Sequence, residues 1–223
     1  MTENPQVLTR QLESTLATNS VIRNTYILLS LTLLFSALTA GVAMATNAPM
    51  LNVWLVLGGY FGLLFATHKL RNSAWGLLAV FALTGFMGYT LGPLLNAYIG
   101  HYANGAQLVV YALGGTGVIF IGLSAYALTT RKDFSFMGGF LMAGVLIAFL
   151  AGIANIFFAM PGLALAVSTM FMLLMCGLIL YETSNLVHGG ETNYILATVG
   201  LYVTIYNLFT SLLHLLGVFG GDD

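Results

Sequence analysis

Glu182 is the first candidate for chemistry in this chain, because it is the only carboxylate inside an apolar run of membrane-spanning length. An ionisable side chain within a membrane helix is costly, so it is a functional candidate by default. Three polar residues, Thr183–Asn185, follow it directly, and two placements stay open. Burial between helices would make Glu182 a proton-sensitive group, whereas a position at the membrane surface would leave it ionised.

A polar stripe runs along the last apolar segment of the chain. Four polar side chains at i, i+3, i+7 and i+10, four residues after a glycine, share one face of a predicted helix. They are Thr204, Asn207, Ser211 and His214, following Gly200. Hydrocarbon cannot satisfy these groups, so the stripe faces partner helices or a hydrated cavity, and the last helix is predicted to be central. Spacing alone leaves open whether the stripe lines a water path or only bonds to its neighbours.

Other reactive residue types form no recognisable site. The four histidines lack metal-ligand spacing, and the single cysteine, Cys176, allows no intrachain disulfide and no cysteine-rich metal site. The sequence contains no phosphate-binding loop, nucleophile elbow or His-Glu-x-x-His motif. We therefore predict no catalytic, cofactor-binding or metal-binding residues, and a protein that is not an enzyme.

The elements that hold these candidates are membrane helices. The 223 residues are 59% hydrophobic and only 6% charged, with a mean hydropathy of +0.93, whereas soluble domains are about 25% charged. The net charge of −1 with six Lys and Arg argues against nucleic acid as a partner. Seven apolar runs are each close to the length of about 20 residues that crosses a bilayer. They are Thr25–Met44, Leu51–Thr67, Ala74–Ile99, Gln107–Leu128, Phe136–Phe158, Leu163–Val187 and Tyr194–Phe219.

These runs do not alternate between apolar and polar residues, so barrel strands are excluded and an all-α integral membrane protein is predicted. The predicted organisation is a flexible cytoplasmic tail at 1–24, a seven-helix domain at 25–219 and a short extracytoplasmic tail at 220–223. With seven spans, all six Lys and Arg fall on one side, which places the amino terminus in the cytoplasm and the carboxyl terminus outside.

Small residues recur at four-residue spacing in three of the predicted helices, which is typical of closely packed membrane helices. They are Ala37, Gly41 and Ala45; Gly88 and Gly92; and Gly144, Ala148 and Gly152. Tight packing within one chain and a dimerisation seam are both compatible with this pattern, and the first is favoured.

Two motifs resemble the signature of the Bax inhibitor (transmembrane Bax-inhibitor-motif) family. They are Gly88–Leu95 and Ala112–Phe120, and the second departs from the family pattern at Gly117, where alanine is usual. Nearly the whole chain is similar to the bacterial YccA-like branch of that family. This similarity is carried by Arg23–Leu33, Leu128–Phe136, Glu182–Asn185 and His188–Tyr194. The resemblance implies six helices in two layers around a central seventh.

The same resemblance implies a function in the bacterial inner membrane. That branch modulates FtsH, the membrane-anchored ATP-dependent protease, as an inhibitor or poor substrate in membrane protein quality control. The alternative is a pH-sensitive calcium or cation leak, which in other family members uses two aspartates. The matching positions here are Glu182 and Thr204, and the second carries no carboxylate. FtsH and membrane lipid are therefore the expected partners, with calcium or protons as transported ions only under the alternative.

Overall fold

The computed structural model describes residues 5–221, and the side chains of residues 16–221. Within these residues the chain forms helices and no strand, which confirms the predicted fold class. Seven helices are long and apolar enough to cross a membrane. They are α1 (Pro5–Ala45), α2 (Val53–Leu70), α3 (Ala74–His101), α4 (Gly105–Thr130), α5 (Gly138–Phe158), α6 (Pro161–Val187) and α7 (Tyr194–Gly220), with a short 3-10 turn, η1 (Ser135–Met137), before α5.

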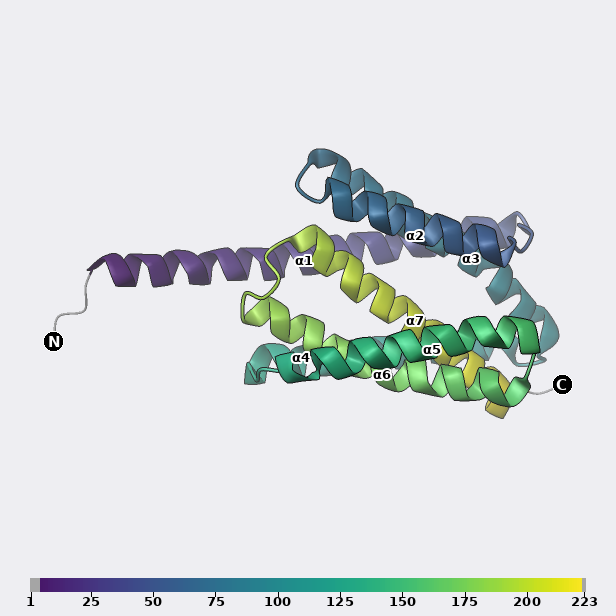
Figure 1. Cartoon of the computed structure of the whole chain (residues 1–223). Coiled ribbons are helices and arrows are strands. Elements are labelled where there is room, and N and C mark those ends of the chain that lie inside the picture. The colour runs from purple at the N-terminus through teal and green to yellow at the C-terminus, as the bar shows by residue number, and fades with distance from the viewer. Residues whose placement is uncertain (1–4, 222–223) are drawn as a thin grey trace.

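The helices form two layers of three with α7 running obliquely between them (Figure 1). In one layer α3 lies between α1 and α2, and in the other α6 lies between α4 and α5. Helix α7 packs against α1, α2, α3, α4 and α6. Its leucines Leu201, Leu208 and Leu213 are fully buried. The last helix is thus central, as its polar stripe predicted.

The predicted spans agree with the helices to within a few residues, except at the start of α1. The structure continues this helix back to Pro5, beyond the rest of the bundle (Figure 1), so residues 5–24 of the predicted tail are helical in it. Residues 1–4 and 222–223 lie outside the described part of the chain. The flexibility of the tail stays a prediction.

Close helix packing occurs at two of the three small-residue patterns. A Cβ atom at Gly92 of α3 would lie 2.5 Å from Ala43 Cβ of α1, and one at Gly144 of α5 would lie 2.6 Å from Leu174 Cδ2 of α6. Ala148 is fully buried. These glycines therefore let the helix backbones approach each other.

The third pattern takes no part in packing within the chain, contrary to the favoured prediction. Ala37, Gly41 and Ala45 are exposed on α1, and nothing lies within 4 Å of a Cβ built at Gly41. Helix α1 instead meets its neighbours through Ala40 and Ala43. Four-residue spacing defines a face of a helix but does not say which face a neighbour covers.

The segments that carry basic residues lie together at one end of the bundle, which we call the basic end. It contains Lys69 in the last turn of α2, Arg71 between α2 and α3, and Arg131 and Lys132 between α4 and α5. Asn193, at the start of α7, donates from Nδ2 to the Arg71 carbonyl at 3.2 Å. Other hydrogen bonds from the end of α6 reach the α4–α5 connection: Ser184 Oγ donates to the Lys132 carbonyl at 3.1 Å, and His188 Nε2 lies 3.1 Å from the Arg131 carbonyl.

Candidate functional site

Glu182 belongs to α6, five residues before the end of that helix, and its side chain points toward α7. Thr204 of α7 donates a hydrogen bond from Oγ1 to Glu182 Oε2 at 3.0 Å. The other carboxylate oxygen, Oε1, faces Gly200, where an added Cβ would come within 2.8 Å of it. Gly200 thus makes room for the carboxyl group, and Thr204 holds it from the next turn of the same helix. Among the described residues, no Lys, Arg or His forms a salt bridge with Glu182.

The carboxyl group of Glu182 borders a cavity of about 670 Å³ between the two layers. Five helices contribute to its walls: α2, α3, α5, α6 and α7. Sixteen of its 22 lining residues are Val, Leu, Phe, Met or Gly. The six polar ones are Tyr60, Thr90, Glu182, Thr204, Tyr206 and Asn207. The cavity is therefore largely apolar, with one carboxylate in its wall.

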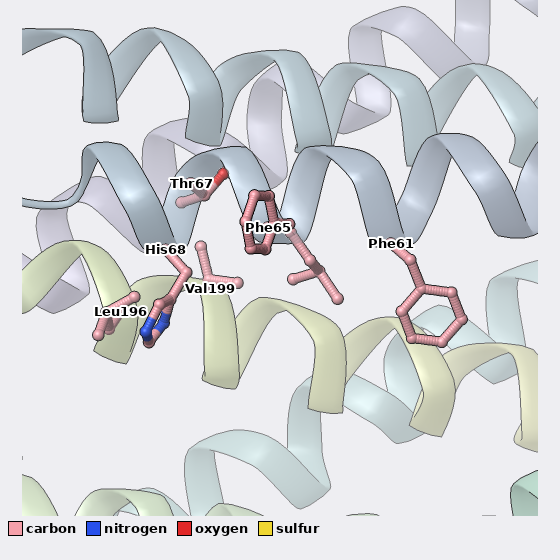
Figure 2. Close-up of a pocket in the computed structure, with 7 residues that line it drawn as sticks. Phe61, Phe65, Thr67, His68, Leu196 and Val199 are labelled. Atoms are coloured by element: carbon pink, nitrogen blue, oxygen red, sulfur yellow. The ribbon is translucent and has the colours of Figure 1, made fainter.

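Two further spaces adjoin this cavity. A small one of about 120 Å³ leads from Glu182 and Gly200 to Asn185 and Glu191. Another, of about 550 Å³, lies between α2 and α7 and shares Phe61, Leu64 and Val199 with the large cavity. Figure 2 shows His68 and Phe61 projecting from α2 toward α7, where Leu196 and Val199 face them. Glu182 is thus positioned between the large apolar cavity and the basic end.

The structure brings together three of the five residues that the sequence singled out. Glu182, Thr204 and Asn207 line the large cavity, and Asn207 Nδ2 donates to the Val203 carbonyl at 2.8 Å. Ser211 is buried and does not line it. His214 Nδ1 lies 2.8 Å from Ser168 Oγ of α6, also outside the cavity lining. The stripe is thus divided between a cavity wall at Thr204 and Asn207 and a helix contact at His214.

Two tyrosines in the cavity wall were missed by the sequence analysis. Tyr60 comes from α2 and Tyr206 from α7, where its hydroxyl lies 3.5 Å from Thr90 Oγ1 of α3. Tyr206 falls two residues after Thr204 and so lies off the predicted stripe. The hydroxyl group of Tyr206 could have indicated that this residue faces inward, because a tyrosine hydroxyl buried in a membrane bundle needs a hydrogen-bond partner.

This arrangement can bind a hydrogen-bond donor. In the described part of the chain, no group of three or more His, Cys, Asp or Glu side chains could hold a metal ion. The cavity presents a carboxylate that accepts a single hydrogen bond from the protein, together with neutral hydroxyl and amide groups. Such a wall favours a hydrogen-bond donor or a cation carried on an apolar body.

Comparisons with known proteins find similarity over almost the whole chain. The family model described as "Inhibitor of apoptosis-promoting Bax1" matches residues 18–221. A Pseudomonas aeruginosa protein, PA2604, is 55% identical over 205 residues, which is 92% of each chain. The "Modulator of FtsH protease YccA" of Escherichia coli K12 is 52% identical over 209 residues, or 94% of each chain. At the same identity and coverage, the relative in Escherichia coli O6:H1 is named "Inner membrane protein YccA".

Proposed function

The chain belongs to the Bax inhibitor family, and from this premise we propose that it is an inner-membrane modulator of the FtsH protease. It acts as an inhibitor or a poorly degraded substrate, and it contributes to quality control of membrane proteins without being an enzyme itself. The observation that carries the proposal is 52% identity, over 94% of both chains, to a protein named for that role.

The orientation that fits this role places the basic end and the amino terminus in the cytoplasm. Its support is the positive-inside rule, because Lys69 and Arg71 at the end of α2 and Arg131 and Lys132 after α4 share one end of the bundle. A periplasm-active reporter fused after Asp223 is expected to be active, and one fused in the α4–α5 loop inactive. The reverse pattern would contradict the orientation and the predicted cytoplasmic access of FtsH.

The proposal is tested in Escherichia coli cells that lack their own YccA. Expression of this chain is expected to slow degradation of membrane substrates of FtsH and leave its soluble substrates less affected. FtsH is also expected to remain with the chain after mild detergent extraction. A matched control is Gly88→Leu, which is predicted below to disrupt the fold. Unchanged substrate half-lives together with no recovered FtsH would overturn the proposal.

The amino-terminal segment is the proposed contact for the protease, because an ATP-driven protease needs a segment to engage. Residues 1–24 form the longest polar stretch of the chain, and α1 extends past the bundle from Pro5. Deleting residues 2–18 is expected to leave the bundle folded and to slow degradation of the chain by FtsH. Because this deletion also removes Arg10, a second variant, Arg10→Ala alone, controls for altered insertion. Turnover that matches the full-length chain would remove the segment from the mechanism.

A cation leak is the second candidate, and the observation that favours it is a carboxylate bordering a cavity inside the bundle. In this arrangement Thr204 stands where a second carboxylate would be needed, and it already donates to Glu182. We therefore expect little pH-dependent calcium flux in proteoliposomes that contain the chain and no protease. Strong flux at one pH that is lost at another, and abolished by Glu182→Gln, would promote the leak over the protease role.

A further inference from the structure

The large cavity has the size and the lining of a ligand site. Its volume of about 670 Å³ lies within the range of about 300–1,000 Å³ that is usual for small-molecule sites. Along α6 it extends from Glu182 to Phe171, about 16 Å at 1.5 Å per residue. An elongated molecule lying parallel to the helices fits this space.

The cavity opens sideways between α2 and α5. The Cα atoms of these helices nowhere come within 8 Å of each other. Three residues that line the cavity are also exposed on the outer surface of the bundle: Phe61 by 47%, Met142 by 64% and Leu146 by 58%. In a membrane this surface faces lipid, so an apolar molecule enters the cavity from the hydrocarbon layer.

Aromatic side chains close the sides of this opening. The rings of Phe61 and Phe149 meet edge to face with centroids 5.8 Å apart, and Trp54 lies 6.3 Å from Phe157. Because α2 and α5 touch through such rings and not through closely packed backbones, rotamer changes widen the entrance without disturbing either layer.

The carboxyl group of Glu182, at one end of the cavity, determines which polar group of a ligand can bind there. Glu182 is the only carboxyl group in the lining, and no Lys, Arg or His is found among the described residues that form it. Thr204 already donates to Oε2, so the remaining oxygen, beside Gly200, is the acceptor that a ligand can use. Asn207 uses its Nδ2 on a backbone carbonyl, which leaves its Oδ1 as a further acceptor. An amine forms a hydrogen bond with this carboxyl oxygen both as an ammonium–carboxylate pair and as a neutral amine–acid pair.

An inorganic cation fits this wall less well. Calcium takes six to eight oxygen ligands, and the cavity provides a single carboxyl group surrounded mainly by apolar side chains. A fatty acid is disfavoured because its carboxylate would face Glu182.

We propose that this cavity is a binding site for a single-chain lipophilic amine, with the amine on Glu182 and the hydrocarbon chain between α2 and α5. The site does not depend on the proposed action on FtsH. Its ligand enters from the leaflet next to the basic end, since Glu182 lies five residues from that end of α6.

Native mass spectrometry of the full chain tests the site, with dodecylamine, dodecanol and dodecanoate as probes and a nonionic detergent as the carrier. One dodecylamine is expected to bind per chain. Dodecanol and dodecanoate are expected to bind with about tenfold lower affinity, because each lacks one charge-assisted hydrogen bond to the site. Glu182→Gln is expected to lower the affinity for dodecylamine by a similar factor and to leave the affinity for dodecanol unchanged. Asp133→Asn removes a carboxylate that lies outside the cavity lining and serves as the matched control, with no expected effect.

A second variant tests the cavity independently of the carboxyl group. Val203→Phe fills part of the lining and is expected to weaken dodecylamine and dodecanol alike. Equal binding of all three probes, wild-type affinity in Glu182→Gln, or the same loss in Asp133→Asn would overturn the proposal. So would wild-type affinity in Val203→Phe. Displacement of dodecylamine by added phosphatidylethanolamine would assign the site to a lipid headgroup and would also overturn it.

Discussion

The two faces of α7 make opposite use of polar residues. One face, here called the closed face, consists of Thr198, Tyr202, Ile205 and Phe209 and packs on α1 and α3. The other, the cavity face, consists of Val199, Gly200, Val203, Thr204 and Asn207.

On the closed face each polar group meets a partner from another helix. The fully buried Tyr202 shares a hydrogen bond of 2.7 Å with Ser36 of α1 and donates to the Thr84 carbonyl of α3 at 3.2 Å. Thr198 Oγ1 donates to the Thr25 carbonyl at 3.2 Å. On the cavity face, Asn207 retains an acceptor that borders the cavity, and so does Glu182 of α6 opposite this face. One helix therefore stabilises the bundle with one face and offers a binding wall with the other, and substitutions on the two faces should differ accordingly.

The largest effect is expected at the contact of α1 and α3, which supports the closed face. A Cβ at Gly88 would collide with the Ser36 carbonyl and with Thr39. Gly88→Leu is therefore expected to destabilise the fold by about 3 kcal/mol or more, since backbone atoms cannot move aside as side chains do. Thermal unfolding in detergent measures the loss. The control is Gly117→Leu on α4, where nothing lies within 4 Å of an added Cβ, and a similar loss there would refute the comparison.

The next effect separates two tyrosines of the same helix. Tyr202→Phe removes two interhelical hydrogen bonds and leaves Ser36 and the Thr84 carbonyl without that partner. A loss of about 1–2 kcal/mol in the free energy of unfolding is expected. Tyr206→Phe removes only a long contact of 3.5 Å with Thr90 beside the cavity, so its loss should be clearly smaller. Equal losses for the two variants would show that the faces do not differ in packing.

A smaller effect is expected from the carboxyl group on the cavity side. In Glu182→Gln the side-chain oxygen still accepts from Thr204, so stability should change by less than about 0.5 kcal/mol. Restraint of FtsH should stay within about twofold of the wild type, because the exchange leaves the loops of the basic end intact. Substrate half-lives in cells measure this restraint. If restraint falls sharply while the thermal unfolding is unchanged, then the cavity takes part in the protease function.

The smallest effect is expected outside both faces, at Asp133 in the α4–α5 loop. The backbone N–H of Ser135 donates to Asp133 Oδ1 at 2.8 Å, and this hydrogen bond lowers the pKa of Asp133 below its usual value. A lowered pKa in the folded state stabilises the protein above the ordinary aspartate range, and this contribution is lost as the pH falls through the lowered pKa. Asp133→Asn should cause a small fall in melting temperature at pH 7 that disappears in acid. A difference that persists at acid pH would assign the effect to something other than ionisation.

Much of the fold could be predicted because bilayer thickness and hydropathy alone define membrane helices. The seven runs, their boundaries apart from the start of α1, and the central place of the last helix agree with the structure. The stripe of α7 predicted that Thr204 faces inward, and the lone Glu182 indicated the helix that meets it. In contrast, the pattern of Ala37, Gly41 and Ala45 was read on the wrong face, since either side of α1 could have met a neighbour.

The sequence by itself determined how many helices cross the membrane and which residues lipid cannot satisfy, because both follow from the cost of placing polar groups in hydrocarbon. The tertiary structure alone decided where Thr204 and Asn207 find space and where Ser211 does not. That difference depends on the space between α2 and α5, which do not pack closely against each other. These helices are distant in sequence, so no local sequence pattern encodes the distance between them in space. A uniform stripe on one face of α7 therefore becomes a cavity wall at Thr204 and Asn207 and a contact with α6 at His214.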